Sequence, residues 1–143
     1  MNRIRLIALG ALALAAVTIA ALSLFPDAAP APYSLERIDI AVTDAERAAG
    51  LSGKEVPEGY WMLFVFPAAG KYGFWMKDTL VPLDIVWLSE RGEVLGIVRD
   101  AAPSSYPQVF YPSVPVRYVL EARGGTAEAR GWATSTVLSL PLQ

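Results

Sequence analysis

Polar residues able to do chemistry are concentrated in one otherwise apolar stretch, Tyr72–Leu88, which contains Lys77, Asp78, Thr79 and Asp84. From residue 81 onward the stretch alternates as a strand does, so Asp84 lies among apolar strand neighbours. A carboxylate in such a place is costly unless something pairs with it. Asp84 is therefore either a structural acid with hydrogen-bond partners, which we favour, or part of a ligand or catalytic site.

A second polar pair, Arg117 and Glu121, occurs in the predicted strand Val116–Arg123. Two carboxylates and a lysine could perform acid–base chemistry if burial gave them different pKa values. However, no spacing in the sequence brings Asp84 and Glu121 together. Acidic residues could also bind calcium, yet the chain has no Asp-x-Asp-x-Asp loop. The sequence therefore predicts neither a metal site nor a cofactor.

Aromatic residues suggest a different class of function, because their faces can stack on sugars or peptides. Large side chains can equally fill a core, and for Phe64 and Trp87 that interpretation is preferred. For Trp61 both interpretations stay open. The candidate ligand-binding residues are Trp61, Trp75, Lys77, Asp78, Thr79, Asp84, Arg117 and Glu121.

The composition excludes several classes of function. The chain has no cysteine and no histidine, which removes disulfides, thiol nucleophiles, the Ser-His-Asp arrangement and the commonest transition-metal ligands. From residue 32 onward, 10 Lys and Arg stand against 13 Asp and Glu. This mildly acidic balance does not favour nucleic acid, which calls for a basic patch.

The N-terminal segment, residues 1–25, combines Arg3 and Arg5 with an uncharged apolar run, Leu6–Phe25. This pattern indicates a signal peptide or an N-terminal membrane anchor, and because the run just reaches spanning length and offers at best a passable cleavage site, the anchor is slightly favoured. Residues 26–34 form a Pro/Ala linker, and residues 35–143 form one domain. We expect an exported domain, periplasmic or on the outer face of the cytoplasmic membrane, with a cytoplasmic N-terminus if the segment is uncleaved.

The domain is predicted to be mainly β, a single β-sandwich or partly closed barrel of about seven strands with one short helix. A capping box at Thr43 and Glu46 starts that helix, Asp44–Ala49. Arg47 on this helix could point toward solvent, which is the preferred interpretation, or toward a site. Pro67–Gly70 is predicted as a turn, and residues 102–115 as a long proline-rich loop. The predicted strands are Leu35–Val42, Tyr60–Phe66, Tyr72–Lys77, Val81–Leu88, Glu93–Asp100, Val116–Arg123 and Thr136–Leu140.

Several blocks in order resemble one known family. The stretch FWMKDTLVPLDIVWL is similar to the signature of domain-of-unknown-function family 192, as are Glu46–Leu51, Trp61–Phe66 and Arg117–Glu121. The resemblance covers residues 35–140 and implies a compact β-rich domain, often behind an export signal, with no settled activity. In two places the chain departs from the family pattern: Ser52 replaces the usual Met, and Asp78 the usual Asn.

These observations favour a membrane-tethered module that binds a glycan, peptide or protein partner at the cell envelope rather than an enzyme. The alternatives are a small enzyme using carboxylate or lysine chemistry and a structural component of an envelope assembly. A concave site uniting Lys77, Asp84 and Glu121 would favour the enzyme, and an exposed aromatic groove the binding module. A broad flat apolar patch would favour the assembly component.

Overall fold

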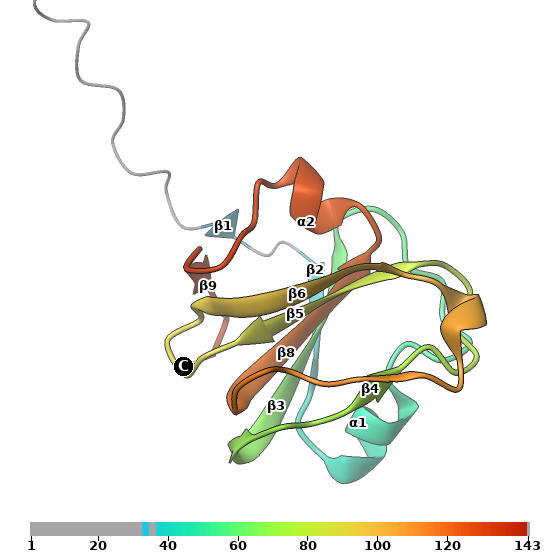
Figure 1. The fold of residues 1–143 in the computed structure, drawn as a ribbon, viewed down its shortest axis with the longest axis horizontal. Helices are drawn as coiled ribbons and strands as arrows, with labels where there is room; N and C mark the ends of the chain where they lie inside the picture. The colour runs from blue at the N-terminus through green and yellow to red at the C-terminus, as the bar shows by residue number, and fades with distance from the viewer. Residues whose placement is uncertain (1–32, 35–36, 143) are drawn as a thin grey trace, which may run out of the picture. The chain divides into compact units, whose positions relative to one another are not determined.

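The structure, a computed structural model, describes residues 33–34 and 37–142, which form short helices and nine strands (Figure 1). The helices are α1 (Asp44–Ala49), α2 (Thr126–Ala129) and a 3-10 turn, η1 (Pro103–Ser105). The strands are β1 (Tyr33–Ser34), β2 (Arg37–Ala41), β3 (Tyr60–Gly70), β4 (Phe74–Trp75), β5 (Leu83–Leu88), β6 (Val94–Ala101), β7 (Val109–Phe110), β8 (Val116–Arg123) and β9 (Leu138–Ser139).

Five of these strands form one central sheet in the order β2-β3-β8-β5-β6. β2 runs parallel to β3, and the other neighbours are antiparallel. Two small sheets, β1-β9 and β4-β7, accompany it. The predicted mainly β domain is confirmed, and its central sheet is open, with β2 and β6 at its edges.

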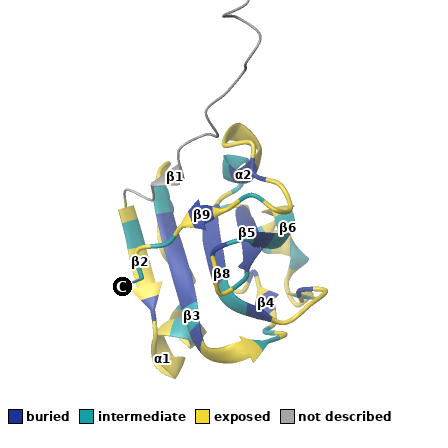
Figure 2. Cartoon of the chain, turned by 90° about the vertical axis from the view of Figure 1, so that its left-hand side faces the viewer, coloured by how far each residue is buried: buried dark blue, intermediate teal, exposed yellow. Residues whose placement is uncertain are grey.

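Both faces of the central sheet are buried, which explains why β5 is apolar at nearly every position. Figure 2 shows buried residues concentrated in β3, β5 and β8. One core contains Phe64, Phe74 and Trp87, as expected for Phe64 and Trp87. The other core, on the opposite face, contains Trp61 and Trp132.

Several local predictions are confirmed. α1 spans the expected residues, and both hydrogen bonds of its capping box form, from the Glu46 N–H to Thr43 Oγ1 and from the Thr43 N–H to Glu46 Oε2. β5 and β6 correspond to two consecutive predicted strands and pair as an antiparallel hairpin, and β8 has the predicted bounds. The helical turn α2 follows β8.

Two predictions around residue 70 are wrong. β3 continues through the expected turn at Pro67–Gly70, because the β3–β8 register shifts between Val65 and Gly70. A proline in an interrupted part of a ladder loses no ladder hydrogen bond. The next predicted strand shortens to β4, since the chain turns at Asp78, which has a φ of 55°.

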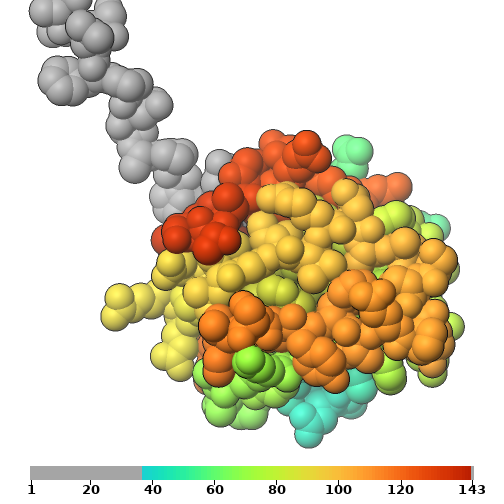
Figure 3. Space-filling model, viewed as in Figure 1, coloured from blue at the N-terminus to red at the C-terminus, as the bar shows by residue number. Residues whose placement is uncertain are grey.

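The long loop at residues 102–115 has structure of its own. It contains η1 and β7, and β7 pairs with β4 through Phe74–Phe110 and Trp75–Val109. Figure 3 shows this segment, in orange, on the surface of the molecule. The loop thereby places a layer of chain over one face of the central sheet.

The predicted N-terminal segment and most of the linker lie outside the described residues. Within residues 33–34 and 37–142, no helix is long and apolar enough to cross a bilayer.

Candidate functional site

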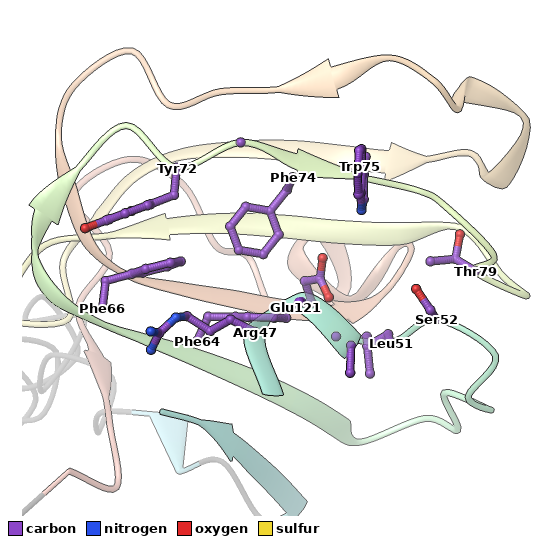
Figure 4. Close-up of a pocket in the computed structure, with 14 residues that line it drawn as sticks. Arg47, Leu51, Ser52, Phe64, Phe66, Tyr72, Phe74, Trp75, Thr79 and Glu121 are labelled. Carbon is purple, nitrogen blue, oxygen red and sulfur yellow. The ribbon is translucent and has the colours of Figure 1, made fainter. Parts of the chain in front are cut away.

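A cavity of about 250 Å³ opens on the face of the central sheet that carries the Phe64 core (Figure 4). It lies among α1, β3, β4 and β8, so residues far apart in the sequence form one wall. Its aromatic lining consists of Phe64, Phe66, Tyr72, Phe74 and Trp75. Arg47, Ser52, Thr79 and Glu121 are its principal polar lining residues.

The aromatic rings of the wall pack against one another. Phe66 and Tyr72 stack with ring centroids 3.6 Å apart, and Phe64 meets Phe74 edge-on at 4.8 Å. Phe74 also packs edge-on against the buried Trp87, at 5.5 Å. Such pairs add stability beyond the area that they bury. These contacts help to hold the aromatic side chains of the wall in place.

Glu121 is the buried polar group of this wall. Its side chain extends from β8, and Figure 4 shows the carboxyl group pointing toward the region between Phe74 and Trp75. The residue is only 4% exposed, and within the described part of the chain its carboxyl group makes no hydrogen bond or ion pair. Burial raises the pKa of Glu121 from an ordinary 4.5 to about 8, so the acid is mostly uncharged at pH 7.

Both aliphatic hydroxyl groups in the lining, those of Ser52 and Thr79, are already engaged by the backbone. Ser52 donates its hydroxyl hydrogen to the carbonyl oxygen of Lys77 at 2.8 Å, and Thr79 donates to the carbonyl oxygen of Met76 at 2.9 Å. These bonds hold the turn between β4 and β5 beside the cavity. Glu121 is consequently the lining carboxyl left to face a ligand.

Arg47 lines the cavity, so the preferred interpretation of it as a solvated side chain is wrong; it was not among the candidate ligand-binding residues. Its Nη1 donates to the carbonyl oxygens of Val42 and Val65, its Nη2 pairs with Asp44, and its guanidinium lies 5.3 Å from the centre of the Phe66 ring. The side chain is 14% exposed. The sequence feature that could have indicated a role for Arg47 is its position in the family-like block Glu46–Leu51. Arg47 holds α1 against the wall, and both of its terminal nitrogens already have hydrogen-bond or ion-pair partners.

At the edge of the cavity, aromatic side chains reach solvent. Trp75 lines the cavity yet is 50% exposed, and it meets the exposed Tyr106 ring at 6.0 Å. Tyr111 is exposed as well, and it packs so closely over Gly73 that a Cβ there would lie 2.7 Å from its ring. A side chain at residue 73 would require the Tyr111 and Val109 side chains to shift.

Asp84 belongs to the opposite face of the sheet. It is fully buried, and its Oδ1 accepts the Asp100 N–H at 2.9 Å while its Oδ2 accepts the Ala127 N–H at 2.7 Å. These bonds fix β6 and the start of α2 to β5. The geometry is that of the structural acid favoured by the sequence.

Of the eight sequence candidates, the cavity brings together Trp75, Thr79 and Glu121. Lys77 and Asp78 are exposed beside it and contribute backbone carbonyl oxygens to hydrogen bonds with Ser52 and Gly53. The other three candidates do not line the cavity: Asp84, Arg117 and Trp61, which packs against Trp132 at 5.1 Å. In the described residues, no three Asp or Glu side chains gather as a metal site would require.

The fold and the cavity define a small, mainly β domain with an aromatic-walled site built around one buried acid. The sequence pattern of domain-of-unknown-function family 192 (DUF192, "Uncharacterized ACR") matches residues 29–140, and the chain belongs to this family. No protein with a curated description matches the chain.

Two solved structures are similar to this one. One is a protein from Sinorhizobium meliloti 1021 that is provisionally described as a transcription regulator, with 30% identity, a TM-score of 0.65, and coverage of 68% of this chain and 76% of that chain. The other is a protein of unknown function from Novosphingobium aromaticivorans DSM 12444, with 30% identity, a TM-score of 0.65, and coverage of 68% and 70%.

Proposed function

We propose that this domain is a binding module that takes one ring-bearing or apolar group of a larger partner into the cavity beside Glu121. The observation that carries the proposal is the carboxyl group of Glu121, a residue only 4% exposed with no hydrogen bond or ion pair in the described chain, in an aromatic-lined cavity. A buried polar group without a partner costs stability. Retaining one is typical of a binding or catalytic site.

The size of the cavity supports a partner that inserts only part of itself. At about 250 Å³ it lies near the lower limit of small-molecule sites, about 300 Å³. One sugar ring or one amino-acid side chain suits this space better than a complete cofactor. Exposed Trp75 and Tyr106 at the edge provide stacking surface for the rest of a glycan or peptide.

Catalysis receives less support from the geometry. An acid–base enzyme needs a second group beside the first, and Asp84 and Lys77 do not line the cavity. The raised pKa of Glu121 would suit a general acid. However, the hydroxyl groups of Ser52 and Thr79 are directed to backbone carbonyls, which leaves no evident nucleophile.

We place the module at the cell envelope, tethered or exported by residues 1–25, because basic residues precede the apolar run. A transcriptional role like that ascribed to the Sinorhizobium protein is not part of the proposal, since the acidic balance from residue 32 onward does not suit nucleic acid. A reporter active only in the cytoplasm, fused after Gln143, should be silent. Activity of that reporter would contradict the envelope location.

Binding is tested by probing the full-length chain against a glycan array and a peptide array. Trp75→Ala should abolish the signal, because Trp75 lines the cavity and reaches its edge. The matched control is Val137→Ala, which alters an apolar residue that is 55% exposed and does not line the cavity. Wild-type binding that survives Trp75→Ala, or no wild-type binding at all, would refute the proposed function.

A further inference from the structure

The surroundings of Glu121 determine which form of the acid a ligand meets. The other ionisable side chains lining the cavity are Arg47, from α1, and Tyr72, from the segment between β3 and β4. Arg47 is committed to Asp44 and to two backbone carbonyls, and the Tyr72 hydroxyl donates to the carbonyl oxygen of Ala68 at 2.8 Å. No hydrogen bond or ion pair in the described chain supports an ionised Glu121. The cavity therefore presents an uncharged carboxylic acid with an O–H donor.

An uncharged acid selects among possible ligand groups. A cation would require ionising Glu121 and stripping water from both charges, which an ion pair does not always repay. A carbonyl oxygen can accept the existing O–H without creating any charge. The neighbouring faces of Phe74 and Trp75 favour an apolar or ring-shaped group next to that oxygen.

We propose that Glu121 acts as an uncharged hydrogen-bond donor to an amide carbonyl oxygen that the ligand carries into the cavity. This inference rests on the proposed binding function and names the chemistry that the site selects. Acetamido groups of glycans and amide groups of peptides share that chemistry. Glu121 is thus the specificity-determining residue of the cavity, and Trp75 supplies the adjoining apolar surface.

We expect binding of an amide carbonyl to Glu121 to weaken as pH rises. The pKa of Glu121 in the empty cavity is about 8, and only the protonated form donates. The bond stabilises that form, so binding is constant below pH 7 and weakens above pH 8. With this pKa, the affinity at pH 9.5 should be roughly 30-fold lower than at pH 6.

The test is isothermal titration of the full-length chain at pH 6 and pH 9.5 with three probes. The probes are a disaccharide of N-acetylglucosamine, the blocked peptide unit N-acetylphenylalanine methylamide, and tetramethylammonium. Glu121→Gln is the matched variant, because its amide also donates but does not ionise. It retains Arg47 and Tyr72, so any pH dependence caused by those residues remains in the variant.

We expect an amide probe to bind at pH 6 and to bind roughly 30-fold more weakly at pH 9.5, and we expect Glu121→Gln to remove this pH dependence. Whichever amide probe binds then identifies a glycan or a peptide source. Amide binding without pH dependence would overturn this inference but not the proposed function. Tetramethylammonium binding that strengthens as pH rises would do the same. Absence of binding by every probe at pH 6 would contradict the inference, and a simultaneous lack of array binding would refute the proposed function too.

Discussion

Asp84 and Glu121 occupy neighbouring strands of one sheet, but their side chains lie on opposite faces. Asp84 is opposite Ala122 in the β5–β8 ladder, and Glu121 is opposite Ile85. Because successive strand residues alternate between faces, this register separates the two acids. Asp84 accepts two backbone N–H groups in the core, whereas Glu121 faces the cavity without a partner. The two buried acids therefore have different roles.

Asp84→Asn should destabilise the domain by on the order of 3 kcal/mol, because one buried backbone N–H would face an amide NH₂ instead of an oxygen. The denaturant midpoint measures this loss. Asp78→Asn is the control, since Asp78 is exposed and has a φ of 55°, a conformation that Asn adopts as readily. Equal midpoints for wild type and Asp84→Asn would contradict the structural role.

Glu121→Gln should stabilise the domain at neutral pH, whereas Asp84→Asn should destabilise it. The carboxyl group ionises near pH 4.5 when unfolded but near pH 8 when folded, so the folded state holds more protons between these values and loses stability as pH rises. Gln does not ionise. The variant should gain on the order of 3 kcal/mol at pH 7 and almost nothing at pH 4, measured by denaturant unfolding at both. A gain independent of pH would show that ionisation is not its cause.

How far the sequence could predict the site depended on local signals. The capping box predicted α1 because its hydrogen bonds join residues three apart, and the alternation in β5 placed Asp84 on the correct face. The partnership of Glu121 with Phe74 and Trp75 could not be predicted, because it depends on how β8 and β4 meet in space. The hydrogen bond of Arg47 to the Val65 carbonyl oxygen could not be predicted for the same reason, because the two residues lie 18 positions apart in the chain.

Substituting the two candidate tryptophans should have different effects: Trp75→Ala should impair ligand binding, and Trp61→Ala should reduce stability. Trp75→Ala should change stability by less than about 1 kcal/mol, since the residue is 50% exposed, yet prevent binding of the amide probe. Trp61→Ala should cost about 3–5 kcal/mol, because it empties a buried site beside Trp132. Thermal unfolding and probe titration provide the comparison. Strong destabilisation by Trp75→Ala would mean that Trp75 is mainly a packing residue.

Ser52, where the family pattern has Met, offers a test of cavity size. Ser52→Met should add an apolar side chain to the lining and weaken amide-probe binding at least about tenfold through steric exclusion. Ser52→Ala is the control, because it removes the bond to Lys77 without adding bulk and should retain binding. Probe titration of both variants decides the outcome. Undiminished binding by Ser52→Met would place the ligand away from this wall.

Carbon-13 NMR of the Glu121 side-chain carboxyl group can show whether this residue is an uncharged acid facing a ligand site. The signal is assigned by its disappearance in Glu121→Gln, and its midpoint is followed from pH 3 to pH 10 with and without the amide probe. We expect a midpoint near pH 8 for the free protein, and we expect that midpoint to rise when the probe binds. A midpoint near pH 4.5 that the probe leaves unchanged would contradict this expectation.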